Sequence, residues 1–154
     1  MFKFKMQPIL RYREWLEDEK KLIFAEKQRI FENEKAKARS LREMRTQYNE
    51  ALREETAKEE VSITMITFYH SYIFFLDKRI TEQDETVAAA ARVLAAAQQE
   101  LIEAKKQKEI MVKLKDRALR VYKEEEARVE QVALDDFSTI KYVRTQRGMN
   151  QFAN

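Results

Sequence analysis

Apolar residues recur every seven positions through the second half of the chain. In the series that starts at Ile66, nine of twelve positions are apolar, and in the series that starts at Tyr69, eight of eleven are. These are the a and d positions of a heptad repeat, which turns one seam of a helix toward a partner helix. The pattern predicts one long helix over about residues 62–146.

The first half carries a more interrupted apolar stripe. The same seven-residue spacing also passes through charged positions such as Lys20, Lys27 and Glu34. The stripe still suits an amphipathic helix over about residues 5–56, with Pro8 tolerated in its first turn. Its apolar positions are Ile9, Tyr12, Leu16, Ile23, Ile30, Leu41, Met44, Tyr48 and Leu52.

An unbroken helix over both halves would be far longer than helices in globular proteins. We expect a turn at about residues 57–61, because Ser62 suits the N-cap of the next helix and the heptad register begins directly after it. The predicted fold class is all-α, with two long helices forming an antiparallel coiled-coil hairpin. We expect a single domain over residues 1–154 that ends in a flexible tail over 147–154.

The second helix is longer than the first and should extend past it. An antiparallel first helix ends opposite about residues 113–118, which leaves about 45–50 Å of helix without a partner in the chain. An apolar stripe on a lone helix is unfavourable in water unless something covers it, so we predict an intermolecular surface there. The stripe consists of Tyr122, Val129, Val132, Phe137, Ile140 and Val143.

Composition supports this interpretation. Charged residues make up 37% of the chain, which has one Gly, one Pro and no Cys. This profile is typical of coiled coils, and tight turns need the residues that are scarce here. The absence of Cys excludes disulfides and fits a reducing cytoplasm. The longest apolar patch, Ile73–Leu76, is far too short to span a bilayer, and the first residues lack a signal-peptide core, so we predict no membrane insertion.

Charge is concentrated at the two ends of the sequence. The net charge is +3, yet residues 1–13 contain four cations, residues 141–154 contain three, and neither segment contains an acid. Such basic ends either keep the chain soluble or contact an acidic surface. No groove-reading motif accompanies them, so nucleic acid is not a predicted partner.

No residue pattern predicts catalysis or a metal site. His70 is the single histidine and has no second His or Cys nearby, so we expect it on the surface or at the edge of the seam. One glycine, Gly148, cannot form a phosphate-binding loop. The acidic run 124–126 points in different directions around a helix and is expected to be solvated. We therefore predict no enzyme activity, no metal and no cofactor.

Aromatic residues crowd the start of the second helix. Packing near the turn explains about half of them, and the remainder suit a protein-binding surface. Tyr69 and Leu76 fall on the seam, whereas Tyr72, Phe75 and Arg79 fall on another face. The group comprises Phe68, Tyr69, Tyr72, Phe74 and Phe75.

Several short motifs resemble the FliJ proteins of the bacterial flagellum, in order and spacing from Phe2 to about Arg147. The first is Phe2–Leu10 with Arg13 and Glu14, and the second is Ser62–Tyr69 followed by Tyr72, Leu76 and Ile80. The third series contains Ala104–Glu109, Leu114, Lys115, Tyr122, Glu125, Arg128, Glu130, Gln131 and Leu134–Asp136.

The resemblance implies a role and partners. FliJ proteins are cytoplasmic parts of the flagellar type III export apparatus, at the inner-membrane base of the flagellum, and form a two-helix coiled coil similar to the stalk of rotary ATPases. The stalk inserts into the hexameric export ATPase, promotes its assembly and links it to the cytoplasmic domain of the membrane export gate. Members of the family also handle free export chaperones.

The resemblance further implies two sets of contact residues. The expected ATPase contacts are Phe4, Leu10, Arg11, Tyr122, Arg128, Val129, Gln131, Val132, Asp135 and Phe137. The expected export-gate contacts are Leu41, Met44, Tyr48, Tyr72, Leu76, Arg79 and Gln83. Arg79 replaces a small residue of some relatives, and a core role stays open for the members that also lie on the seam, namely Met44, Tyr48, Leu76 and Gln83.

Other functions stay open on the sequence. One is the equivalent stalk of a virulence-type secretion system or of a rotary ATPase. Another is a structural homodimeric coiled coil with an extended chain, about 210 Å long against about 125 Å for the longer hairpin arm. A membrane-binding amphipathic helix fits less well, because charge is balanced along the chain.

Overall fold

The computed structural model describes residues 1–151, with side chains through Tyr142. Helix α1 spans Gln7–Thr56 and helix α2 spans Ile63–Gln151, which confirms the predicted all-α hairpin and excludes the extended-chain alternative. The chain divides into two compact units, which are described separately. We call Trp15–Lys106 the hairpin unit, and Met1–Glu14 with Gln107–Asn154 the terminal unit.

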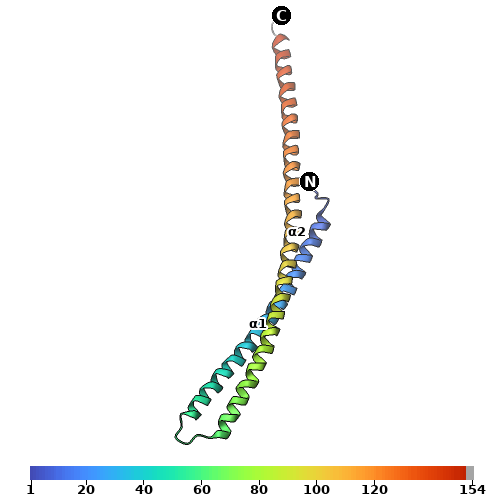
Figure 1. Cartoon of the computed structure of the whole chain (residues 1–154). Coiled ribbons are helices and arrows are strands. Elements are labelled where there is room, and N and C mark those ends of the chain that lie inside the picture. The colour runs from blue at the N-terminus through green and yellow to red at the C-terminus, as the bar shows by residue number, and fades with distance from the viewer. Residues whose placement is uncertain (152–154) are drawn as a thin grey trace. The chain divides into compact units, whose positions relative to one another are not determined.

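In the hairpin unit, α1 and α2 lie side by side and antiparallel (Figure 1). Exposed ion pairs contribute little stability individually, so their role is mainly to fix the register of the two helices. Pairs that cross between the helices include Lys20–Glu100 at 2.8 Å, Arg42–Asp84 at 2.6 Å, and Arg45–Asp77.

The heptad register predicted for α2 coincides with its least exposed positions. In the hairpin unit, every seam position from Ile66 to Ala104 is buried or half-buried, and in the terminal unit the same holds from Lys108 to Tyr122. Leu76 is 1% exposed and is the largest fully buried side chain among those described. Every described seam position after Tyr122 is exposed, so the pairing ends there.

On α1, part of the predicted apolar stripe is not buried. Ile9, Tyr12 and Ile30 are exposed, whereas Glu17 and Ala38 are buried. The prediction for the three exposed residues was wrong because the buried face of α1 passes through polar positions. Long polar side chains can occupy such positions when their head groups remain paired, as in Glu17–Lys21 at 3.1 Å and Lys20–Glu100 at 2.8 Å.

One polar layer crosses the seam of the hairpin unit. The Gln83 side-chain amide donates to the backbone oxygen of Glu34 at 3.1 Å and to its carboxylate at 2.6 Å. The Lys37 ammonium donates to the same carboxylate at 2.7 Å, and with Gln83 it lowers the pKa of Glu34. A slipped register would leave these polar groups unpaired, so the layer favours the observed alignment.

Glu55 closes the turn at residues 57–62. Its side chain is buried, one carboxylate oxygen accepts the Ser62 backbone N–H at 3.3 Å, and the other accepts a hydrogen bond from Lys58. Ser62 is the N-cap, as predicted, because its Oγ accepts the Met65 N–H at 3.4 Å. A carboxylate at this point also interacts favourably with the N-terminal dipole of α2.

We expect Glu55→Gln to lower the midpoint of thermal unfolding at pH 7 by about 2–4 °C. The hydrogen bond from Lys58, followed by the one from Ser62, lowers the pKa of Glu55 below its ordinary value of 4.5. The contribution of the carboxylate is therefore present above about pH 4.5 and is lost as the pH falls through the lower folded pKa. Circular-dichroism melts at pH 7 and pH 3 measure both effects.

The control for this substitution is Glu50→Gln, at an exposed position of the same helix. It should preserve both the melting midpoint and its change with pH. Wild type should lose more stability between pH 7 and pH 3 than Glu55→Gln does. Parallel pH profiles for wild type and Glu55→Gln would contradict the assigned role.

In the terminal unit, the segment before α1 lies against α2. The Phe2 and Tyr122 ring centroids are 5.6 Å apart, and the Met1 ammonium donates to the Tyr122 hydroxyl at 2.9 Å. That hydroxyl donates in turn to Glu126 at 3.1 Å, which raises the pKa of Tyr122. Pairing within the chain therefore reaches Tyr122, past the predicted limit at 113–118. An extended residue advances about 3.3 Å, against about 1.5 Å in a helix. A few non-helical residues before α1 therefore cover the stretch of α2 between the predicted limit and Tyr122.

The C-terminal boundary also differs from the prediction. Helix α2 continues to Gln151, so residues 147–151 are helical and do not form the expected flexible tail. The last three residues of that predicted tail, 152–154, and the side chain of Val143 lie outside the described residues. No helix in the described part of the chain has the length and apolar content needed to cross a membrane.

Candidate protein-binding surfaces

The first candidate surface is the part of α2 beyond Tyr122, residues 123–142, which we call the overhang. All of its side chains are exposed. Phe137 is 73% exposed, so the apolar groups are open to water rather than partly covered by neighbours. So many large apolar side chains open to water on one segment favour a partner that covers them. The large apolar side chains are Val129, Val132, Leu134, Phe137, Ile140 and Tyr142.

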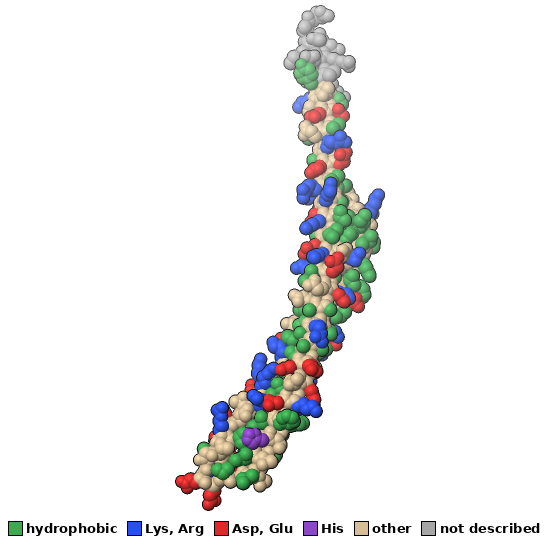
Figure 2. All heavy atoms as spheres, in the orientation of Figure 1, with side chains coloured by type: hydrophobic (Ala, Val, Ile, Leu, Met, Phe, Trp, Pro, Cys, Tyr) green, Lys and Arg blue, Asp and Glu red, His purple; other side chains and the backbone are tan. Residues whose placement is uncertain are grey.

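These apolar side chains are distributed around the whole helix. Successive residues are turned by about 100° around a helix axis. By that spacing, Leu134 lies about 140° to one side of Val129, and Tyr142 lies about 140° to the other side. Figure 2 shows hydrophobic and charged side chains interspersed on this part of the chain. A single partner helix could cover only one face, whereas a partner that encloses the helix could cover all of them.

The overhang contains six of the ten residues predicted to contact an ATPase. The polar ones bond locally on the exposed surface, since Arg128 pairs with Glu125 at 2.8 Å and Gln131 donates to Asp135 at 3.0 Å. Their outer surfaces stay accessible to a partner. The six residues are Arg128, Val129, Gln131, Val132, Asp135 and Phe137.

The other four predicted ATPase contacts lie nearer the N-terminal segment of the same unit. Arg11 is exposed and Leu10 is buried, so Leu10 offers no free contact surface. Phe4 is half-buried beside a groove of about 500 Å³ that Lys115 also lines. Tyr122 is half-buried under Phe2, so it belongs to the pairing within the chain and not to the unpartnered stripe.

The second candidate surface is a group of five rings near the turn, which we call the aromatic face. Tyr72 lies at its centre, with its ring centroid 4.4 Å from that of Tyr48, 6.0 Å from that of Phe68 and 5.9 Å from that of Phe75. Phe68 and Phe75 are each 51% exposed, so the outer part of the group is open to a partner. Mutual ring packing holds such side chains in place before any partner binds. The five rings are those of Tyr48, Phe68, Tyr69, Tyr72 and Phe75.

The structure brings only part of the predicted gate set onto the aromatic face. Tyr48 and Tyr72 belong to it, and the Tyr72 hydroxyl donates to the sulfur of Met44 at 3.5 Å. Leu76 is buried in the seam, and Leu41 is half-buried.

The two polar members of the gate set lie apart from these rings. The side chain of Gln83 is engaged in the polar layer with Glu34. Arg79 is exposed and pairs with Glu82 at 3.2 Å.

Three residues of the aromatic face, Phe68, Tyr69 and Phe75, were absent from the predicted export-gate set, and Tyr69 was expected on the seam. Phe68 and Phe75 lie outside the heptad register, although with Tyr72 they follow the spacing i, i+4, i+7. That spacing marks a second stripe on one helix, which was the signal available in the sequence. Phe68 and Phe75 are the exposed rings of the aromatic face, whereas Tyr72 between them is half-buried.

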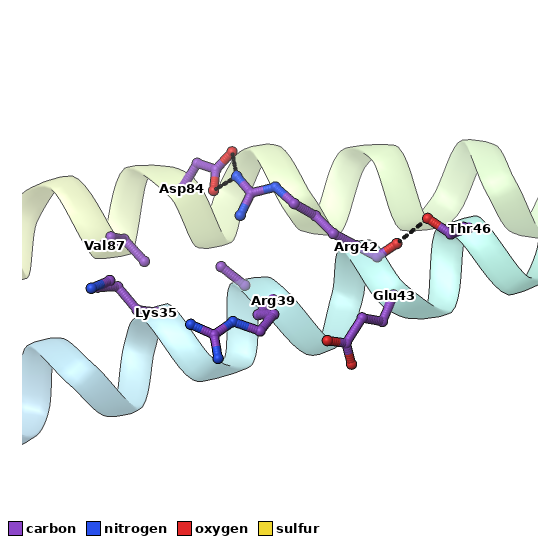
Figure 3. Close-up of a pocket in the computed structure, with 8 residues that line it drawn as sticks. Lys35, Arg39, Arg42, Glu43, Thr46, Asp84 and Val87 are labelled. Carbon is purple, nitrogen blue, oxygen red and sulfur yellow. Dashed lines mark hydrogen bonds and ion pairs between the residues drawn. The ribbon is translucent and has the colours of Figure 1, made fainter.

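A groove of about 410 Å³ runs along the hairpin unit between the two helices (Figure 3). Arg42 spans it and binds both carboxylate oxygens of Asp84, at 2.6 and 2.8 Å. The three cations that line the groove are nearly balanced by two acids, so the groove has no strong preference for a charged ligand. No group of three or more His, Cys, Asp or Glu among the described residues could hold a metal ion. The groove is lined by Lys35, Ala38, Arg39, Arg42, Glu43, Thr46, Asp84 and Val87.

Comparison with known proteins identifies the family. A family model described as flagellar FliJ protein matches residues 2–147. A solved structure of a putative YscO homologue from Chlamydia trachomatis has the same fold, with a TM-score of 0.64 and 21% identity, over 96% of this chain and 99% of that chain. No curated protein matches. Because the family model spans nearly the full sequence, this chain belongs to the FliJ family of flagellar proteins.

Proposed function

We propose that this protein is the central-stalk adaptor of a flagellar type III export apparatus and has no catalytic role. Its overhang inserts into the pore of the hexameric export ATPase and promotes assembly and activity of the ring. The observation that supports this proposal best is the distribution of exposed apolar side chains around the whole overhang. Membership of the FliJ family supports this role. The proposed setting is the cytoplasm, at the inner-membrane base of the flagellum.

Burial of the overhang provides a sufficient driving force for insertion. Covering a large apolar side chain contributes about 1.5–3 kcal/mol, so six of them contribute about 10 kcal/mol or more. Lost translational and rotational freedom offsets much of this gain. The remainder suits a complex that forms readily yet can still dissociate.

The aromatic face is the proposed contact with the cytoplasmic domain of the export gate. Pre-ordered rings with exposed outer surfaces resemble the anchors that dominate binding energy in many interfaces. This contact lies near the turn of the hairpin unit, whereas the ATPase contact lies in the terminal unit. The ATPase and the export gate therefore contact separate residues. Export chaperones are the third proposed class of partner.

Titration of the full chain into the purified cognate ATPase tests the function. We expect the protein to raise ATP hydrolysis and to shift the ATPase from monomers to rings, because an inserted helix bridges several subunits at once. Mass photometry and a phosphate-release assay measure the two effects. An ATPase whose mass distribution and rate do not respond would contradict the proposed function.

A further inference from the structure

The terminal unit carries two bands of opposite charge. Residues 1–14 and 107–123 contain ten Lys and Arg against three Asp and Glu, a net charge of +7. Residues 124–136 contain six Asp and Glu against one Arg, a net charge of −5. We call the first the basic collar and the second the acidic band. The sign of the charge therefore changes directly after Lys123, the first residue of the overhang.

Both parts of the basic collar lie side by side. The Phe2 ring contacts that of Tyr122, and Lys3 and Lys115 line the same groove. The cations consequently come from both members of the pair, the N-terminal segment and α2.

The cations of the basic collar are mostly unmatched within the chain. In the hairpin unit, by contrast, cations such as Lys20 and Arg42 bind acids on the facing helix. An unmatched group of cations creates a positive potential that extends into solvent and attracts an acidic partner. Among the described residues, no ion pair neutralises Lys3, Lys5, Arg11, Arg13, Lys113, Lys115, Arg117, Arg120 or Lys123.

We propose that the basic collar docks on an acidic rim at the mouth of the ATPase ring and that the change of sign after Lys123 sets the depth of insertion. This inference rests on the proposed function. On α2 the collar spans about 24 Å and the acidic band about 20 Å. Both exceed the screening length of about 8 Å at physiological ionic strength, so a partner senses each band separately. An acidic rim attracts the collar and repels the acidic band, which is stable only further inside the ring.

A protein partner explains the two bands better than a membrane or a nucleic acid does. Anionic lipid or nucleic acid would attract the basic collar but repel the acidic band directly beside it. A protein rim can present acidic groups at one level and basic groups at the next.

Charge reversal on one stripe of α2 tests the collar. The collar variant is Lys113→Glu, Arg117→Glu, Arg120→Glu, which leaves every apolar residue of the overhang in place. The matched control is Arg39→Glu, Lys78→Glu, Arg92→Glu in the hairpin unit, with the same change in net charge at exposed cations that have no ion pair among the described residues.

Stopped-flow fluorescence measures the association rate of each variant with the preassembled ATPase ring at low and physiological salt. We expect the collar variant to associate about 10- to 100-fold more slowly than wild type at low salt, because charge at an interface acts mainly on the encounter rate. The wild-type rate should fall with added salt, and the control should retain most of that rate. Reversal of acidic residues at the mouth of the ring should restore association of the collar variant.

The remaining outcomes separate the possible failures. Equal association rates and equal salt dependence for the collar variant and the control would overturn the proposed docking of the collar but leave the proposed function intact. A wild-type chain that does not bind the ring would overturn both. Vesicles of phosphatidylglycerol that bind wild type but not the collar variant, together with equal rates on the ring, would assign the cations to lipid and overturn the collar.

Discussion

Replacing Val129, Val132 and Phe137 together by glutamine is expected to abolish stimulation of the export ATPase while the hairpin stays folded. Each buried apolar side chain contributes about 1.5–3 kcal/mol to association, so losing three weakens binding by about a thousandfold or more. Glutamine retains good helix propensity, and these positions are exposed, so helicity and melting should not change. A binding titration and the rate of ATP hydrolysis measure the loss, and far-UV circular dichroism measures the fold.

The matched control places glutamine at three exposed apolar positions of the hairpin unit, Leu22, Phe74 and Val93. It removes a similar amount of exposed apolar surface, so it reports any general effect on solubility. Full stimulation by the control and none by the overhang variant would place the ATPase contact on the overhang. Full stimulation by the overhang variant would rule out these residues as the contact.

Single substitutions distinguish an enclosing partner from a flat one. Leu134 and Tyr142 lie on opposite sides of Val129 around the helix. If the ring surrounds the overhang, glutamine at each of the three positions should weaken binding. If one partner helix packs along a seam, only the positions on that face should respond.

The seam of α2 was predictable because apolar residues occupy most of its heptad positions. The register that begins at Ile66 coincides with the low-exposure positions up to Tyr122. The end of the pairing was not predictable in the same way. The residues that extend it, Phe2 and Phe4, belong to a non-helical segment in which no periodic pattern exists to be read.

The face of α1 could not be obtained from hydrophobicity alone. Glu17 is buried there, whereas Ile9, Tyr12 and Ile30 of the predicted stripe are exposed, so the apolar pattern indicates the wrong side in places. Long polar side chains can occupy buried positions when their head groups are paired, as Glu17 is with Lys21. The apolar pattern of one helix gives no information about the size of the residues that the other helix places against it.

The candidate surfaces were predictable to different degrees. The overhang follows from helix lengths, which are a property of the chain as a whole. The aromatic face was only partly recognised, since Leu76 lies on the same helix near Tyr72 and Phe75 but is buried. Deciding which side chain packs inward requires the position of the partner helix.

Leu76→Ala is expected to destabilise the hairpin by about 2–5 kcal/mol and to lower its melting midpoint by roughly 10 °C. Its side chain is 1% exposed in the seam, and truncation there leaves a cavity between the helices. Phe74→Ala is the control, because Phe74 lies two residues away and is 75% exposed. We expect that control to change stability by less than about 0.5 kcal/mol. Urea unfolding followed by circular dichroism measures both variants.

Stability and gate binding, measured for both Phe75→Ala and Leu76→Ala, separate the role in folding from the role in gate binding. Phe75→Ala removes an exposed ring of the aromatic face, so it should weaken binding of the export-gate domain without a comparable loss of stability. Leu76→Ala should bind the gate normally at a temperature at which it is fully folded, because the side chain has no exposed surface to offer. A Leu76→Ala chain that melts like wild type but fails to bind the gate would mean that Leu76 turns outward to meet that partner. The order of the two effects therefore decides whether this leucine holds the hairpin together or contacts the gate directly.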